Sequence, residues 1–283
     1  MSRRALGLIV PLLLCAVALF ALSVATVNAD SAARANRAGA PPDLRTTNAI
    51  STVVYLPVVG RAPLPCPAPG ASYGTVAVLS APANPPAAVN PDINLALRGY
   101  TATTGTLGLI DIPSTVDANA PQLYRLFADN RVPVFQAVYQ VYDWNWSSNS
   151  RGAPIADPPV TLAGFQVAPG EPICAPGSGY NIGLTPAGYA MMVLYASANR
   201  ITLKYTREDN VFYGYTLHIE NINVDPDLLS LYQAMNAAGR SRLPALFAGQ
   251  PIGAAITTEL GVAIRDTGSF MDPRSHYDWW QGK

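Results

Sequence analysis

Residues suited to acid–base or metal chemistry are scarce in this sequence, and histidine is the scarcest. The chain has two histidines, His218 and His276. His218 stands two residues before Glu220 in an alternating segment, so a strand would place both side chains on one face as an acid–base pair. The alternative, which we favour, is a half-buried strand histidine with a carboxylate beside it. His276 follows a polar turn and is expected to be solvated.

Paired carboxylates could hydrolyse a glycosidic bond, one acting as acid and the other as base or nucleophile. Nothing in the spacing of the acidic residues singles out two of them. The candidates are Asp111, Asp143, Glu171, Glu208 and Glu259.

Aromatic residues form two clusters that could bind a sugar. Tyr142, Trp144 and Trp146 alternate along the chain, so a strand would present the three rings on one face. Trp279 and Trp280 lie together near the C-terminus. Aromatic faces pack on the C–H groups of sugars while polar neighbours pair with the hydroxyls. The alternative is that these rings plug the interior or seal its ends.

Short apolar segments between turns predict a mostly β fold with antiparallel strands. The 26 prolines and 22 glycines punctuate these segments throughout. Strands are expected at 76–79, 95–97, 132–142, 159–167, 191–196, 201–205, 212–219 and 260–265. Apolar residues at helical spacing predict two short helices, at Ser114–Asn130 and Asp225–Gly239.

The N-terminus predicts export. Residues 1–29 combine a positive start, a long apolar run and small residues before a cleavage point after Ala29, which is typical of a signal peptide. The alternative is an uncleaved membrane anchor, because the apolar run is long enough to span a bilayer. We expect a secreted or cell-envelope protein that meets a membrane only if this segment stays uncleaved.

Two cysteines remain after the predicted cleavage, Cys66 and Cys174. An even number in an exported chain permits one disulfide, and the alternative is two free thiols. Cys66 lies in residues 30–71, where Ala, Arg, Asn and Pro without periodicity predict a disordered, Pro-rich linker.

The charge of the chain argues against a nucleic-acid partner. Charged residues make up 13% of the chain and the formal net charge is zero. The charged share is about half that of an average globular protein. Nucleic-acid binding needs a basic face or block, and the sequence offers neither.

The C-terminal part of the chain carries a family resemblance. It reads G-Q-P-I-G at Gly249–Gly253, then an apolar strand at Glu259–Arg265, then Asp272–Pro273. This order resembles the M23-type (lysostaphin-like, duplicated hybrid motif) zinc peptidases of secreted bacterial proteins. In that family the order is G-Q-x-I-G, H-x-H-F-E-x-R and D-P. The resemblance extends back to Gly177, and it implies an antiparallel barrel or sandwich over residues 171–283.

The same resemblance places the zinc ligands of the family at Gly177, Asn181 and Gly261. A catalytic zinc needs three protein ligands and an open position, and glycine has no side chain to offer. Gln233 and Glu259 stand where the family has its two helper histidines. The resemblance therefore implies a degenerate barrel without zinc or another cofactor, to which residues 72–170 add an accessory, β-rich N-terminal extension.

We expect a non-catalytic binding or structural protein of the cell surface, with peptidoglycan or another glycan as partner. The alternative is a zinc-independent hydrolase of a cell-wall or extracellular polymer. The ligand-binding candidates are Tyr142, Trp144, Trp146, Asn181, Gln233 and Glu259.

Overall fold

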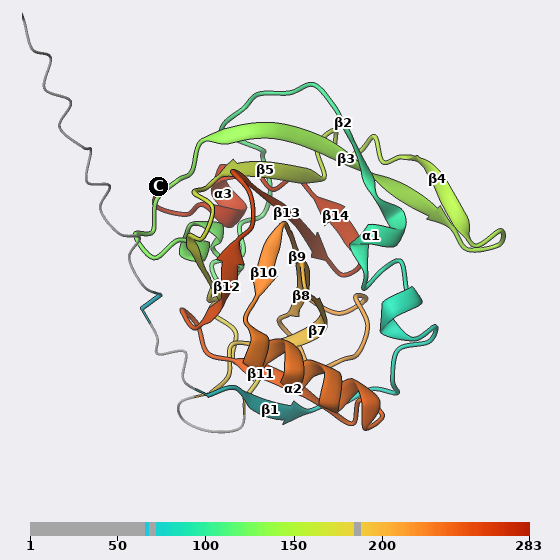
Figure 1. The fold of residues 1–283 in the computed structure, drawn as a ribbon. Coiled ribbons are helices and arrows are strands. Elements are labelled where there is room, and N and C mark those ends of the chain that lie inside the picture. Colours follow the sequence, from blue (N-terminus) through green and yellow to red (C-terminus); the bar gives the residue numbers. More distant parts are fainter. Residues whose placement is uncertain (1–65, 68–71, 184–187) are drawn as a thin grey trace, which may run out of the picture. The chain divides into compact units, whose positions relative to one another are not determined.

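The computed structural model describes residues 66–67, 72–183 and 188–283. The predicted signal peptide and most of the predicted linker lie outside these residues. The described chain is mostly antiparallel β, which confirms the predicted fold class (Figure 1). None of its helices has the length and apolar character needed to cross a bilayer.

Eleven strands form the main sheet. Its path runs β1-β11-β7-β8-β9-β13-β5-β3-β2, while β14 pairs with β13 and β4 pairs with β3. The strands are β1 (Gly74–Ala77), β2 (Tyr100–Ala102), β3 (Phe135–Asn145), β4 (Ser150–Pro154), β5 (Leu162–Gln166), β7 (Met191–Ser197), β8 (Arg200–Lys204), β9 (Tyr215–Glu220), β11 (Arg242–Leu246), β13 (Glu259–Asp266) and β14 (Ser269–Met271).

A smaller sheet has three strands in the order β10-β12-β6. They are β10 (Ile222–Val224), β12 (Pro251–Ala255) and β6 (Pro172–Cys174). Both sheets are open within the described residues, an arrangement consistent with a sandwich. The sequence predicts residues 72–170 and 171–283 as separate segments. Because β5 pairs with β13, one sheet contains strands from both.

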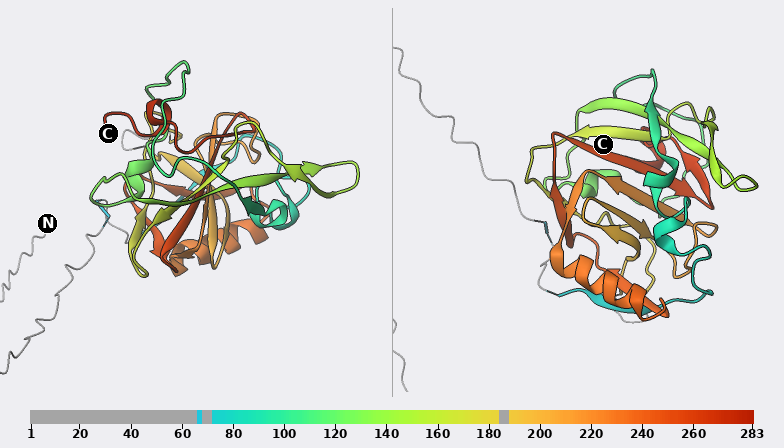
Figure 2. Two further views of the ribbon diagram at one scale, coloured as in Figure 1. Left: turned by 90° about the horizontal axis from the view of Figure 1, so that it is seen from above. Right: turned by 45° about the vertical axis from the view of Figure 1, so that its right-hand side comes forward.

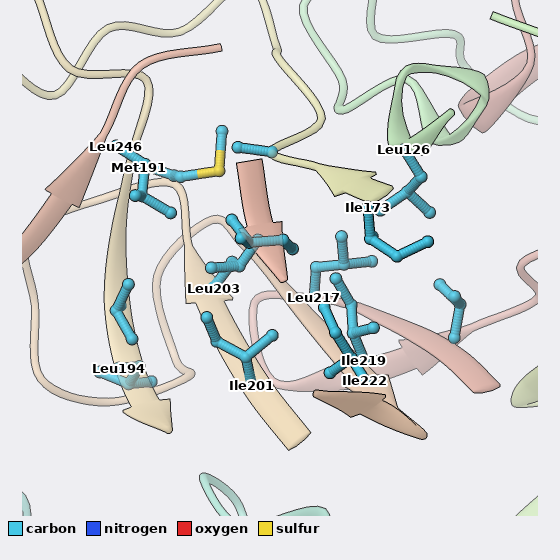
Figure 3. Close-up of a cluster of buried hydrophobic side chains, with 14 of the residues drawn as sticks. Leu126, Ile173, Met191, Leu194, Ile201, Leu203, Leu217, Ile219, Ile222 and Leu246 are labelled. Carbon is cyan, nitrogen blue, oxygen red and sulfur yellow. The ribbon is translucent and has the colours of Figure 1, made fainter. Parts of the chain in front are cut away.

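The strand predictions succeed where apolar residues alternate with polar ones. Figure 3 shows Ile201 and Leu203 of β8 and Leu217 and Ile219 of β9 in one apolar cluster. These side chains are at most 1% exposed. Alternation sends the residues between them, such as Thr202 and His218, to the opposite face of the sheet.

The opposite face carries an unusual number of buried polar side chains. Lys204, His218, Glu220 and Arg265 are each at most 4% exposed. The segment before β2 covers part of this layer. Its Asp92 accepts hydrogen bonds from the guanidinium group of Arg265 at 3.1 Å.

Two element predictions are wrong, and local chemistry explains both. Residues 114–130 form no α-helix but only a short 3-10 helix, η2 (Leu123–Leu126), because Pro121 lacks a backbone N–H and disfavours helical geometry before it. The predicted strand at 95–97 is the helix α1 (Leu95–Arg98), in which the Asn94 side chain caps the amide of Ala96. Two further short helices are η1 (Ala87–Val89) and α3 (His276–Trp279).

The second predicted helix is confirmed as α2 (Pro226–Ala237). Asp225 caps its first turn by accepting hydrogen bonds from the amides of Asp227 and Leu228. The predicted disulfide is also confirmed. Cys66 is bonded to Cys174 in β6, with 5.5 Å between their Cα atoms.

Candidate functional site

A pocket of about 360 Å³ that combines carboxylates with aromatic rings lies at the ends of β8, β9 and β13. Strand alternation and two loops bring its residues together from five separate segments. We name it the tyrosine–aspartate pocket after its lining residues, which are Asp117, Tyr180, Tyr205, Thr206, Gly214, Tyr215 and Asp266.

Asp117 organises one wall of this pocket. Its Oδ2 accepts hydrogen bonds from the hydroxyls of Tyr180 at 2.9 Å and Tyr215 at 2.8 Å. Its Oδ1 accepts the amide of Asn119 at 2.8 Å. Burial acts to raise the pKa of Asp117, but these hydrogen bonds outweigh it and hold the pKa below its ordinary value. The ionised carboxylate thus fixes two tyrosine side chains.

Asp266 has a different environment at the end of β13. No side chain of the described residues donates a hydrogen bond to its carboxylate, which is half-buried. Burial, followed by the negative charge of Asp117, raises the pKa of Asp266. Lys204 opposes this shift, but its ammonium donates to the carbonyl of Tyr213 and the hydroxyl of Thr216. Burial lowers the pKa of Lys204 to about 8.

Aromatic rings surround these carboxylates. Tyr180 and Tyr215 have ring centroids 6.3 Å apart, and Tyr215 packs edge-on against Trp279 at 5.6 Å. Phe212 and Tyr213, on the loop that leads into the pocket residue Gly214, are 61% and 60% exposed. The pocket therefore combines one fixed carboxylate, Asp117, and one less constrained carboxylate, Asp266, with the exposed ring of Tyr180.

The three aromatic candidates of the sequence lie on the β3–β4 hairpin, which projects from the sheet in Figure 2. Trp146 is 52% exposed, and the guanidinium of Arg151 lies 5.9 Å from the ring of Tyr142. The indole N–H of Trp144 is buried without a hydrogen-bond partner among the described residues. None of these three side chains lines the tyrosine–aspartate pocket.

The other three candidates come from separate elements. Glu259, at the start of β13, accepts a hydrogen bond from the Tyr139 hydroxyl at 2.8 Å. Asn181 is exposed in the loop before β7 and accepts the amide of Gly183. Gln233 is exposed on α2. Hydrogen bonds within the described chain do not join the three residues.

The positions matched to zinc ligands have no shared environment. A side chain added at Gly177 would meet Ala248, whereas one at Gly261 would meet Glu220. Among the described residues, no group of three or more His, Cys, Asp or Glu side chains could hold a metal ion.

His218 is 1% exposed, more deeply buried than the half-buried residue expected. Its Nδ1 lies 3.1 Å from the Thr202 hydroxyl, and its Nε2 has no partner in the described chain. Glu220 forms an ion pair with Arg200. His276, in contrast, contacts Asp111 at 2.9 Å near the surface.

Trp279 and Trp280 are buried, which agrees with the alternative that these rings fill or seal the interior. They are 2% and 0% exposed. The ring of Trp280 packs against Phe135 and Phe165 at 5.9 and 5.5 Å.

Sequence reasoning missed most of the pocket because its residues lie in unrelated segments. Asp117 lies inside the predicted helix at 114–130, and Asp266 directly follows the predicted strand at 260–265. A G-x-S-x-G pattern at residues 70–74 was also missed. A nucleophile elbow needs a helix directly after the serine. Ser72 instead leads into β1, so the structure does not supply that context.

Comparison with protein families found no family model that matches the chain, and comparison with curated proteins found no match. The M23-type resemblance therefore stays a prediction.

Proposed function

We propose that this chain is an exported, non-catalytic protein that binds a glycan of the cell surface, such as peptidoglycan, in the tyrosine–aspartate pocket. The observation that carries the proposal is the combination of tyrosine rings, the fixed carboxylate of Asp117 and the carboxylate of Asp266 in one hollow of about 360 Å³. Its volume lies at the lower end of the usual range for small-ligand sites.

The chemistry of the pocket suits a sugar. Tyr180 and Tyr215 are oriented by Asp117 before a ligand arrives, so binding would not require their ordering. Their rings can pack on sugar C–H groups, while Asp266 and Thr206 offer oxygens to the hydroxyls. Export is supported by the disulfide, since such bonds persist in oxidising compartments.

Sedimentation of the full-length chain with insoluble peptidoglycan, and with chitin for comparison, tests this proposal. Tyr180→Ala removes a pocket ring and should weaken binding about tenfold, a typical loss for a contact ring. Tyr277→Ala is the matched control, because both tyrosines are 44% exposed and Tyr277 lies outside the pocket. Equal losses in the two variants, or a wild-type chain that stays in the supernatant with both glycans, would contradict the proposal.

A second candidate function is zinc-independent hydrolysis by Glu220 and Glu259. Gly261, two residues after Glu259, pairs with Glu220 across the sheet, and both carboxylates act on the pKa of Tyr100. Burial raises the pKa of Glu220, as a general acid requires. Release of reducing ends from peptidoglycan by the wild type, lost in Glu259→Gln, would favour this function over simple binding.

A further inference from the structure

We propose that the tyrosine–aspartate pocket binds a protonated amine, so that its preferred glycan carries free amino groups. The identity of the ligand as a sugar rests on the function proposed above. The amine preference follows from the charges and rings of the pocket itself.

The lining residues of the pocket carry negative charge without a basic partner among them. Asp117 and Asp266 are its two charged lining residues. Three hydrogen bonds favour the ionised form of Asp117, so the wall carries a negative charge at neutral pH. A neutral sugar would leave this charge uncompensated, whereas an ammonium group would neutralise it.

Asp266 is the carboxylate that remains available to the ligand. Both oxygens of Asp117 are occupied, but Asp266 receives no side-chain hydrogen bond within the described chain. The cation that acts on it, Lys204, is buried and directs its ammonium to Tyr213 and Thr216. The backbone amide of Thr267 is the donor that acts on Asp266, and a half-buried carboxylate with so few donors is stabilised when a ligand cation reaches it.

The rings around the carboxylates favour the same ligand group. A cation near the face of a tyrosine ring is attracted by the ring quadrupole, and the attraction grows as water is excluded. Tyr180 and Tyr215 lie beside Asp117, so one ammonium can meet a carboxylate and a ring together. Recognition of amines by aromatic residues and carboxylates is an established use of this chemistry.

Calorimetric titration of the full-length chain at about pH 7 tests the inference. The probes are β-1,4-linked glucosamine tetramer, its fully N-acetylated counterpart, and 1,5-diaminopentane. We expect the glucosamine tetramer to bind about tenfold or more tightly than the acetylated one, since acetylation removes the charge. Asp266→Asn should abolish this preference.

Asp157→Asn is the matched control, because Asp157 is exposed and lies outside the pocket. It should leave the preference intact. Asp266→Asn is expected to fold, since the structure already disfavours the charged form of this residue.

The probes separate the two proposals. Binding of diaminopentane that Asp266→Asn removes, without binding of either tetramer, supports the amine site and contradicts glycan recognition. Equal binding of both tetramers supports glycan recognition and overturns the amine site. A glucosamine preference that survives Asp266→Asn also overturns it.

Discussion

Asp117 shows how a single residue can prepare a binding site. Its Oδ2 holds two tyrosine hydroxyls, but Tyr215 is 9% exposed whereas Tyr180 is 44% exposed. Tyr215→Phe should therefore lower the free energy of unfolding by about 1.5–3 kcal/mol, the usual cost of a lost hydrogen bond to a charged group. Tyr180→Phe should cost less than about 0.5 kcal/mol. Urea unfolding of both variants checks the difference, and equal losses would contradict it.

His218 gives the chain a predictable response to acid. Burial, followed by the charges of Arg265 and Arg98, lowers its pKa well below the ordinary value. Below about pH 6.5 this histidine is protonated in the unfolded chain but stays neutral in the folded chain. The free energy of unfolding therefore falls as the pH is lowered. His218→Gln should flatten this fall, which has a limiting slope of about 1.4 kcal/mol per pH unit.

His276 is the matched control for that experiment. Its hydrogen bonds to Asp111 and to the Lys283 carbonyl raise its pKa, so it stabilises the folded chain in acid and loses this effect as the pH rises. Below about pH 6.5 this stabilisation is complete, so His276→Gln should lower stability there by a constant amount and leave the slope of the acid fall unchanged. Urea unfolding at several pH values measures both slopes, and a wild-type slope unchanged in His218→Gln would refute the assignment.

Individual site residues were the least predictable part of the chain. An even number of cysteines in a chain expected to be exported favours the disulfide, with two free thiols as the alternative, and the structure confirms the bond. The pocket could not be predicted in this way, because Asp117, Tyr180 and Asp266 are brought together by loops whose paths depend on tertiary packing. The positions of Asp117, Tyr180 and Tyr215 in the sequence do not indicate that the three side chains share one hydrogen-bond network.

At the scale of elements, Arg240 anchors the end of α2 to the body. Its guanidinium makes two hydrogen bonds to Asp209, at 2.6 and 2.7 Å, and one to the carbonyl of Leu194 at 2.8 Å. Asp209 also accepts the amide of Ala83. Both side chains are at most 5% exposed.

Arg240→Met should lower the free energy of unfolding by about 3–5 kcal/mol, because it leaves Asp209 buried without its countercharge. Arg242→Met is the control. Arg242 is exposed and bonds to Thr75, so its loss should cost less than about 1 kcal/mol. Guanidinium unfolding measures both, and a small effect of Arg240→Met would show that the ion pair is dispensable.

Elements with clear alternation were predictable from sequence, as β7, β8, β9 and β13 show. The failure at residues 114–130 has a physical cause. The apolar residues of this segment are buried, as they would be in a helix, and Leu123 and Leu126 are fully enclosed. The helical spacing of the apolar residues therefore predicted which side chains are buried. It did not predict the backbone conformation, because Pro121 disfavours an α-helix.

At the scale of the whole molecule, the disulfide closes the longest covalent loop in the described chain. It joins residues 108 positions apart. Cys66→Ser with Cys174→Ser should lower the free energy of unfolding by about 2–4 kcal/mol, because the unfolded chain regains conformational entropy. Urea unfolding of the variant, compared with wild type under reducing and oxidising conditions, checks this value. A variant as stable as the oxidised wild type would refute it.

The position of this bond also determines how the molecule bears load. Strand β1 follows Cys66 along the chain and, among the described strands, pairs with β11 alone at one end of the sheet path. Tension applied through the residues before Cys66 passes through the covalent link into β6 and does not unzip β1 from its neighbour, one hydrogen bond at a time. Reduction would transfer that tension to β1, so the redox state of one bond would determine whether the sheet edge peels under force.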